Sequence, residues 1–162
     1  MIALIDGDIC VYRVGFTTQE DEEWIAEARM KELLANILSN VKANDYTIYL
    51  TSTDKSNFRY NIYPEYKANR KAEKPVHYQF LRDFLIKNYA SVEIFLAEAD
   101  DALAKHQTED TIICTIDKDL NQIPGWHYNF VKDEKYYVSE EDAIKFFYYQ
   151  LLVGDSADNI PG

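Results

Sequence analysis

Three carboxylates stand within four residues, at Glu98, Asp100 and Asp101, where an apolar run at residues 92–96 gives way to a helical pattern. A helix start tolerates one or two acids, because its free N–H groups and its dipole favour negative charge by roughly 0.3–1 kcal/mol each. A third acid calls for a cation. On an ideal helix Glu98 and Asp101 share a face that Asp100 does not, so all three converge only where the helix is still unwinding. Alone, the stretch fits an acidic helix start and a ligand cluster equally well.

Strands and helices alternate along the predicted chain. Apolar and β-branched runs predict strands, and apolar residues at helical spacing predict helices. The alternation favours one α/β domain over residues 1–162, with a mostly parallel, twisted central sheet flanked by helices. We expect strands at residues 2–5, 46–51, 92–96, 111–116, 127–131 and 136–138, helices at about residues 20–43, 75–89, 98–107 and 139–153, and a loop or short helices at 55–74.

Acidic residues gather where these strands end, which is where ligands bind in an open parallel sheet. Unneutralised, such a cluster would raise its own pKa values. Carboxylates without histidine or cysteine beside them favour the hard cations Mg²⁺ or Mn²⁺, and two such ions about 3.5–4 Å apart suit in-line hydrolysis of a phosphodiester. The acids are Asp6, Asp8, Asp54, Glu98, Asp100, Asp101, Asp117, Asp119, Asp155 and Asp158.

Each acidic motif also has a purely structural interpretation. The Asp-Gly-Asp motif at residues 6–8 fits a turn that ends a strand, and the Asp-Lys-Asp motif at 117–119 fits a helix cap. The aromatic run at 146–149 is more typical of core packing than of base stacking. What these interpretations leave unexplained is the recurrence of acids at four successive strand ends.

Charge is strongly segregated along the chain. The net charge of −11 argues, at face value, against a nucleic-acid partner. Residues 55–87, however, hold eight basic and three acidic residues, a local net charge of +5, so that the rest carries −16. A basic run is often only a solvated face, but here tyrosines are interleaved with lysines and arginines. Such a segment suits phosphates and stacked bases, and beside an acidic metal site it indicates a nuclease.

Composition and length restrict the class of protein. With 162 residues, 47% of them hydrophobic and 14% aromatic, the chain can bury a real core. No apolar run is long enough to span a membrane and the opening strand meets Asp6 at once, so we expect a soluble, intracellular protein without a signal peptide. Cys10 and Cys114 stand in apolar surroundings, which is typical of buried reduced thiols rather than of a disulfide or zinc site.

Five ordered motifs resemble those of the 5′-nuclease or flap-endonuclease superfamily, a PIN-like fold, and in particular those of the 5′-3′ exonucleases of short-tailed bacteriophages. The resemblance covers essentially the whole chain. It implies hydrolysis of DNA from a 5′ end, or of RNA annealed to DNA, and cleavage at 5′ flaps in replication. The motifs are Ile5-Asp6-Gly7-Asp8, Pro64-x-Tyr66-Lys67-Ala68-Asn69-Arg70-Lys71, Glu98-Ala99-Asp100-Asp101, Asp117-Lys118-Asp119-Leu120 and Gly154-Asp155-x-x-Asp158-Asn159-Ile160-Pro161-Gly162.

The resemblance also implies two Mg²⁺ or Mn²⁺ ions per site and divides the acids between them. Asp101 would lie between the two metal sites. The other ligands would be Asp6, Asp54, Glu98 and Asp100, mainly for the first metal, and Asp117, Asp119, Asp155 and Asp158 for the second metal or its waters.

The basic segment would supply the nucleic-acid contacts implied by the same resemblance. Lys67 and Arg70 would contact the scissile phosphate as electrostatic catalysts, and Tyr66 would stack on the terminal base. Lys71 and Lys74 would add to the binding surface. The implied partners are DNA with free 5′ ends or 5′ flaps, bound by a monomer in the cytoplasm, that of a bacterial host if the protein is phage-encoded.

Two departures from the family pattern bear on these assignments. In many members the second-strand aspartate comes six residues before the Phe-Arg pair, where this chain has Ser52. We assign the role to Asp54, four residues before Phe58, because serine is a poor metal ligand. The family also continues past residue 162 into a helical hairpin that grips duplex DNA, so we expect a fragment or a grip supplied otherwise. Because the basic segment at 55–75 is short, any arch over the site is small.

Two other functions fit parts of the sequence. A haloacid-dehalogenase-type phosphatase would use an Asp-x-Asp pair such as that at residues 6–8 and a later Gly-Asp such as that at 154–155. Its Gly-Asp, however, follows a strand, whereas here it follows a predicted helix, and the acids at 98–101 would be left unused. A flap-binding module with little activity is the second alternative, because the C-terminal DNA grip is missing. Phosphatase activity on small phosphoesters, or flap binding without turnover, would favour these functions.

Overall fold

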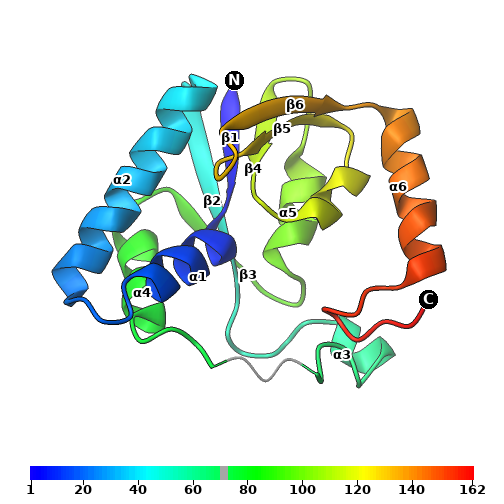
Figure 1. Ribbon diagram of the computed structural model, residues 1–162, viewed down its shortest axis with the longest axis horizontal. Coiled ribbons are helices and arrows are strands. Elements are labelled where there is room, and N and C mark those ends of the chain that lie inside the picture. The colour runs from blue at the N-terminus through cyan, green and yellow to red at the C-terminus, as the bar shows by residue number, and fades with distance from the viewer. Residues whose placement is uncertain (70–72) are drawn as a thin grey trace.

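A six-stranded sheet forms the centre of the computed structural model, which describes residues 1–69 and 73–162 (Figure 1). Its strands lie in the order β3-β2-β1-β4-β5-β6; neighbours from β3 to β5 are parallel, and β5 and β6 are antiparallel. The predicted α/β fold with a mostly parallel sheet is therefore confirmed. The strands are β1 (Ile2–Asp6), β2 (Asp45–Thr51), β3 (Ser91–Ile94), β4 (Thr111–Cys114), β5 (Gly125–Asn129) and β6 (Glu134–Val138).

The chain changes direction across the sheet beside β1. It adds β2 and β3 on one side of β1 and then returns to place β4 on the other side. In open α/β sheets such a switch point leaves a crevice outside the carboxyl ends of the neighbouring strands. Asp6 ends β1, and Asp117 follows the end of β4. The topology therefore brings these two acids to the crevice.

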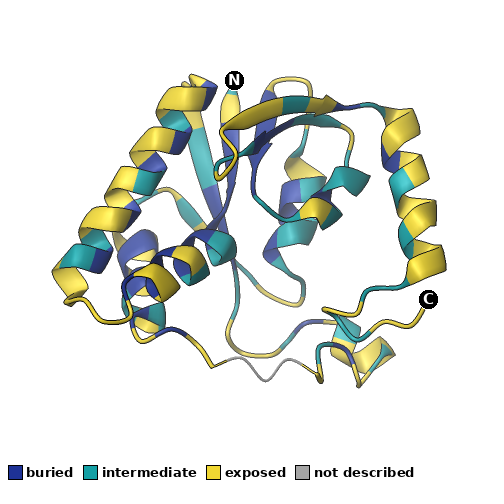
Figure 2. Ribbon diagram, in the orientation of Figure 1, coloured by how far each residue is buried: buried dark blue, intermediate teal, exposed yellow. Residues whose placement is uncertain are grey.

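β1 is the central strand because its side chains suit burial on both faces. Ala3 and Ile5 belong to the larger core, which also includes residues of α1, α2 and α4. Leu4 points to the other face, into a smaller core with α5. Figure 2 shows this burial along the middle of the sheet and the inner sides of the helices. The four helices are α1 (Gly7–Thr17), α2 (Glu23–Val41), α4 (Tyr78–Asn88) and α5 (Ala99–His106).

The remaining elements lie at the edges of the molecule. The short helix α3 (Arg59–Ile62) and turns make up the described part of the basic segment, as predicted. The 3-10 helix η1 (Lys118–Gln122) follows β4, and α6 (Glu140–Val153) follows β6. Ser139 caps α6 by accepting from the backbone N–H of Asp142 at 3.1 Å, at the start of the helix predicted over residues 139–153. No helix in the described part of the chain is long and apolar enough to cross a membrane.

Two predictions about helices were wrong or incomplete. Helix α1 was not predicted, because its short apolar stripe is interrupted by charged and hydroxyl residues. Pro75 was expected in the first turn of α4, but that helix begins at Tyr78. Pro75 is buried instead against Gly15 of α1, where an added Cβ would lie 2.6 Å from the proline Cγ. The proline therefore packs the loop before α4 onto α1.

Gly7 allows α1 to start directly against β2. A Cβ at this position would lie 2.6 Å from the Tyr49 carbonyl oxygen and 2.7 Å from Cγ2 of Ile48. Because the first obstacle is backbone, it cannot move aside as a flexible side chain would. Asp6 is therefore the last residue of β1 and the N-cap of α1 at once, with no loop between them.

Replacing this glycine tests the close approach. We expect Gly7→Ala to lower the free energy of unfolding by about 1–3 kcal/mol, because overpacking forces α1 away from β2. Urea denaturation followed by circular dichroism measures the change. Asn36→Ala, at an exposed position of α2, is the control and should leave the midpoint almost unchanged. An unchanged midpoint for Gly7→Ala would show that the approach is not tight.

Candidate functional site

A cleft of about 520 Å³ opens at the carboxyl ends of β1, β2 and β4. An adjoining hollow of about 400 Å³ lies between α5, η1 and α6 and shares part of its acidic lining. Most of the acids predicted at the strand ends therefore come together. Those that line the cleft are Asp6, Asp8, Glu98, Asp100, Asp117, Asp119, Asp155 and Asp158.

Asp6 lies at the back of the cleft with 1% of its surface exposed. It accepts from the backbone N–H of Ile9 at 3.1 Å and from Thr115 Oγ1 at 2.7 Å. Burial, helped by the charges of Asp8 and Asp117, raises the pKa of Asp6 to about 7 despite these two bonds. An ionised Asp6 is thus poorly compensated within the protein.

Asp100 is a second buried carboxylate whose negative charge is poorly compensated, and its pKa is raised further than that of Asp6. Burial raises its pKa to about 8, helped by the negative charges of Asp6, Asp117 and Glu98, while Lys67 acts in the opposite direction. These carboxylates are therefore close enough to repel one another in a partly desolvated space. A divalent cation would relieve that repulsion.

The start of α5 is regular, which corrects one expectation. Glu98 is the extended N-cap, with φ −105° and ψ 164°, and the helix proceeds from Ala99. The helix does not have to unwind to bring Asp100 toward the cleft. In the regular helix, Asp100 already lies close enough to Asp6 and Asp117 for their charges to raise its pKa. The three acids do not converge on one point: Asp101 instead accepts from the backbone N–H of Glu98 at 2.9 Å.

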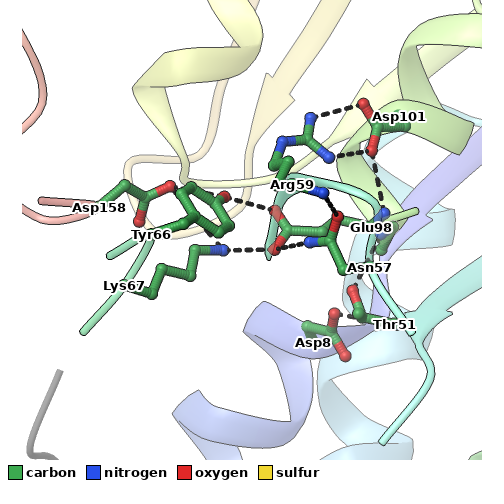
Figure 3. A network of polar contacts seen from close by, with 10 residues as sticks. Asp8, Thr51, Asn57, Arg59, Tyr66, Lys67, Glu98, Asp101 and Asp158 are labelled. Atoms are coloured by element: carbon green, nitrogen blue, oxygen red, sulfur yellow. Dashed lines mark hydrogen bonds and ion pairs between the residues drawn. The ribbon is translucent and has the colours of Figure 1, made fainter. Parts of the chain in front are cut away.

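Glu98 is surrounded by donors from the basic segment (Figure 3). Lys67 Nζ and Asn57 Nδ2 donate to its Oε1 at 2.7 and 2.8 Å, and the Tyr66 hydroxyl donates to its Oε2 at 3.0 Å. The same hydroxyl oxygen lies 2.9 Å from Asp158 Oδ2, so its single proton is shared between the two carboxylates. The segment thus supplies the counter-charge that Glu98 lacks on its own helix.

Asp101 is held by an arginine that the sequence analysis did not single out. Arg59 donates two bonds to its carboxylate, at 2.6 and 2.7 Å. Burial opposes ionisation of Asp101, but these bonds and the Glu98 N–H outweigh it, so the pKa falls below its usual value. In the sequence, the Phe-Arg pair served only to locate the second-strand aspartate. The positive charge of its arginine was the one feature that could have indicated an acidic partner.

Asp8 is held by a second unexpected arginine. Arg82 of α4 is 1% exposed, and its guanidinium donates to Asp8 at 3.1 Å, to Glu93 at 3.1 Å and to the Thr51 carbonyl at 2.8 Å. Thr51 in turn donates its backbone N–H to Asp8 and accepts from Ala99 N–H through its hydroxyl. Because a buried arginine must be paired, it fixes α1, β2 and β3 relative to one another.

Thr115 and Gln150 connect the second group of acids. Thr115 Oγ1, which donates to Asp6, also accepts from the backbone N–H of Asp117 at 3.0 Å. Asp117 caps η1 by accepting from Asp119 N–H at 2.9 Å. Gln150 of α6 donates to Asp119 at 2.6 Å. Burial raises the pKa of Asp119, as do the charges of Asp117 and Asp155.

The residues predicted to contact nucleic acid lie in different surroundings. Lys67 and Lys74 line the cleft, and Lys74 Nζ lies 4.2 Å from the ring centroid of Tyr78. Tyr66 is only 5% exposed, so its ring offers no open face to a base in this conformation. The predicted contacts of Arg70 and Lys71 lie outside the described residues.

The two candidates for the second-strand ligand differ in position. Ser52 lines the cleft, whereas the exposed Asp54 is not part of the lining. Asp54 accepts from the backbone N–H of Ser56 at 2.9 Å, and bonds to Ser56 lower the pKa of its carboxyl. Asp101 lines the adjoining hollow but not the cleft itself.

The donor set fits hard divalent cations by its chemistry. The carboxylates of Asp6, Asp100 and Asp117 line the cleft, and the charge of Asp117 raises the pKa of both Asp6 and Asp100. Carboxylate oxygens are the ligands that hard divalent cations prefer. No group of three acidic, histidine or cysteine residues in the described part of the chain already forms a metal shell. Glu98, by contrast, is satisfied by lysine, tyrosine and asparagine.

The raised pKa values predict how the metal-free protein responds to pH. Asp6 and Asp100 hold their protons in the folded state up to about pH 7 and 8, whereas in the unfolded state they lose them near pH 4. Between these limits the unfolded state binds fewer protons, so stability falls as pH rises. In EDTA, the melting temperature should therefore drop from pH 5 to pH 8.5.

The control for this prediction is Asp100→Asn, which removes the group with the higher raised pKa. It should raise the melting temperature in EDTA at pH 8.5 and flatten the pH dependence. Added Mg²⁺ should stabilise the parent protein more at pH 8.5 than at pH 6, because protons compete with the cation. A parent protein that grows more stable from pH 5 to pH 8.5 in EDTA would contradict the charge imbalance.

Known proteins are similar to this chain in sequence and in structure. A 5′-3′ exonuclease of Buchnera aphidicola is 29% identical over 99% of this chain, and the exonuclease of Escherichia phage T7 is 24% identical over 99%. The chain spans 64% and 62% of their lengths. The bacteriophage T5 flap endonuclease, crystallised with DNA and metal ions, superposes with a TM-score of 0.73 at 16% identity, covering 99% of this chain and 69% of that one.

A family model that matches most of the chain agrees with these similarities. The T5 protein shares the fold, and its coverage extends over the sheet and over the cleft at its edge. The model for the 5′-3′ exonuclease, N-terminal resolvase-like domain, matches residues 1–147, which include β1 to β6 and most of the acids at the cleft. The chain therefore belongs to the 5′-3′ exonuclease N-terminal domain family.

Proposed function

We propose that this chain is a divalent-metal-dependent nuclease domain that hydrolyses phosphodiester bonds of DNA from 5′ ends and at 5′ flaps. The observation that carries the proposal is the acidic centre formed by Asp6, Asp100 and Asp117, beside Lys67 of a basic segment. Repelling carboxylates favour bound cations, and the lysines at the rim favour a polyanion. Together they suit a phosphodiester held against metal ions.

The proposed metal is Mg²⁺ or Mn²⁺, as two ions per site. When bound, two such ions activate a water molecule and stabilise the leaving oxygen of a phosphodiester. Family membership and the metal ions crystallised with the T5 flap endonuclease support the proposal. The residues proposed to hold the ions or their waters are Asp6, Glu98, Asp100, Asp117, Asp119, Asp155 and Asp158.

The chain's own cations would act on the substrate. Lys55, Lys67, Lys74 and Lys118 line the cleft, where they would bind successive phosphates. Lys67 lies deepest among the acids, since its ammonium donates to Glu98 at 2.7 Å and lies 3.8 Å from Asp158. A metal ion that replaced this contact would leave Lys67 to stabilise charge on the scissile phosphate. The proposal extends to RNA annealed to DNA, because these lysines would contact phosphates, which both backbones carry.

The geometry does not favour the phosphatase alternative. Its nucleophile would be Asp6, but that side chain is 1% exposed and both oxygens accept hydrogen bonds. Its general acid would be Asp8, which is paired with Arg82. The Gly-Asp motif at residues 154–155 follows α6 rather than a strand.

A nuclease assay tests the proposal. With Mg²⁺, we expect the protein to shorten a 5′-labelled flap substrate, and Asp117→Asn to lower kcat on the order of a thousandfold, because the metal's stabilisation of charge is worth several kcal/mol. Asp110→Asn, at the opposite end of β4 and exposed, is the matched control and should retain activity. Turnover that persists in EDTA, or flap binding without any turnover, would contradict the proposal.

Lys67 tests the role of the basic segment. Lys67→Ala should lower kcat by about 10²–10³-fold, as removal of one charge-stabilising donor does. Lys87→Ala, an exposed lysine of α4, is the control and should have little effect. Single-turnover kinetics on the flap substrate separates the chemical step from binding. A Lys67→Ala variant that loses affinity but keeps kcat would show that the lysine only binds.

A further inference from the structure

The basic segment that carries Lys67 is attached to the start of α5 by contacts outside the acidic centre. Phe58 donates its backbone N–H to the Leu96 carbonyl at 2.8 Å, and Leu96 N–H donates to Ser56 Oγ at 2.9 Å. Arg59 then reaches Asp101 with two bonds, at 2.6 and 2.7 Å. The segment therefore runs alongside residues 96–101, with the arginine pair at the far end of the attachment (Figure 3).

We propose that Arg59, through its ion pair with Asp101, is a positioning residue that holds Lys67 at the acidic cleft. The inference deepens the proposed function, on which its catalytic consequence rests. Arg59 does not line the cleft itself but the adjoining hollow, so it acts through the segment rather than on the substrate.

The ion pair is suited to an anchoring role because its geometry is fixed on both sides. Two parallel bonds between a guanidinium and a carboxylate define an orientation as well as a distance. Asp101 is held in turn by the Glu98 backbone N–H at 2.9 Å, as part of the α5 cap. The hydrogen bonds to its two oxygens thus come from Arg59 and from the helix start. Asp101 is a rigid point to which the segment is attached.

Arg59 reaches Lys67 through the tyrosine between them. Its guanidinium carbon lies 5.9 Å from the ring centroid of Tyr66, and the Tyr66 hydroxyl binds Glu98 and Asp158. Lys67 Nζ lies 4.8 Å from the same ring. The buried ring therefore lies against both cations and connects Arg59 to Lys67.

The arginine pair differs from the Lys67–Glu98 contact in that it can persist during the reaction. Lys67 has to leave Glu98 before it can neutralise a phosphate, and that step removes its own link to α5. The Arg59–Asp101 pair involves neither Lys67 nor the centre of the cleft, so it still holds the segment. Without it, the released lysine would not be kept near its phosphate.

Chemical labelling tests the anchor without relying on activity. The Lys67 side chain is 18% exposed and that of Lys145 is 66% exposed, so limited acetylation by N-hydroxysuccinimidyl acetate, read by mass spectrometry, can use Lys145 as the internal reference. In metal-free protein, Arg59→Ala should speed Lys67 acetylation about tenfold, the loss expected for a charge-assisted bond. The matched control is Arg29→Ala, which removes an exposed arginine–glutamate pair on α2, and should leave the rate unchanged.

Equal Lys67 labelling in Arg59→Ala and Arg29→Ala would overturn the proposal. Because the Arg59 and Asp101 side chains remain 28% and 35% exposed, both variants should fold, and circular dichroism checks this. Labelling needs no turnover, so an inactive parent protein would overturn the proposed function while the labelling still decides whether Arg59 anchors Lys67.

A double-mutant cycle then tests the route of action. On a 5′-flap substrate with Mg²⁺, Arg59→Ala and Asp101→Asn should each lower kcat/KM about tenfold, and the double variant should be no worse than either alone. Arg59→Lys should recover only part of the loss, because lysine lacks the two-pronged geometry. If Asp101→Asn costs the same factor again in the Arg59→Ala background, Asp101 acts independently of Arg59 and the proposal fails.

Discussion

Repulsion between carboxylates at one edge of the sheet is the constraint on which the rest of the site depends. β1 and β4 end side by side at the switch point, so Asp6 and Asp117 are forced together by the topology, and α5 adds Asp100. Among the described residues, none of the three forms an ion pair with an arginine or a lysine. The fold tolerates this because the packed strands and helices behind the cleft hold the acids in place.

The acids that surround this centre form ion pairs, unlike the acids in it. Asp8 is paired with Arg82, Asp101 with Arg59, and Glu98 with Lys67, and each cation comes from an element other than that of its acid. These pairs join α1 to α4 and α5 to the basic segment. The paired outer acids therefore assemble the site, while the inner acids are left with the mutual repulsion that a cation would relieve.

The sequence was enough to predict the sheet and its acids, because strand periodicity and strand-end acids are local patterns. It could not predict α1, whose apolar stripe is too short to stand out, or the packing of Pro75 on Gly15. The partners of the acids were also missed, since they lie far along the chain: Thr115 is 109 residues from Asp6, and Arg82 is 74 from Asp8. Only the folded chain shows which cation meets which acid.

Anomalous scattering from a crystal soaked in Mn²⁺ tests the central claim most directly, because it locates the cation without any assumption about substrate. We expect manganese in the cleft within ligand distance of Asp100, with Asp6 or Asp117 contributing an oxygen or a bound water, and Lys67 displaced from Glu98. A cleft without manganese, with Lys67 still on Glu98, would contradict it.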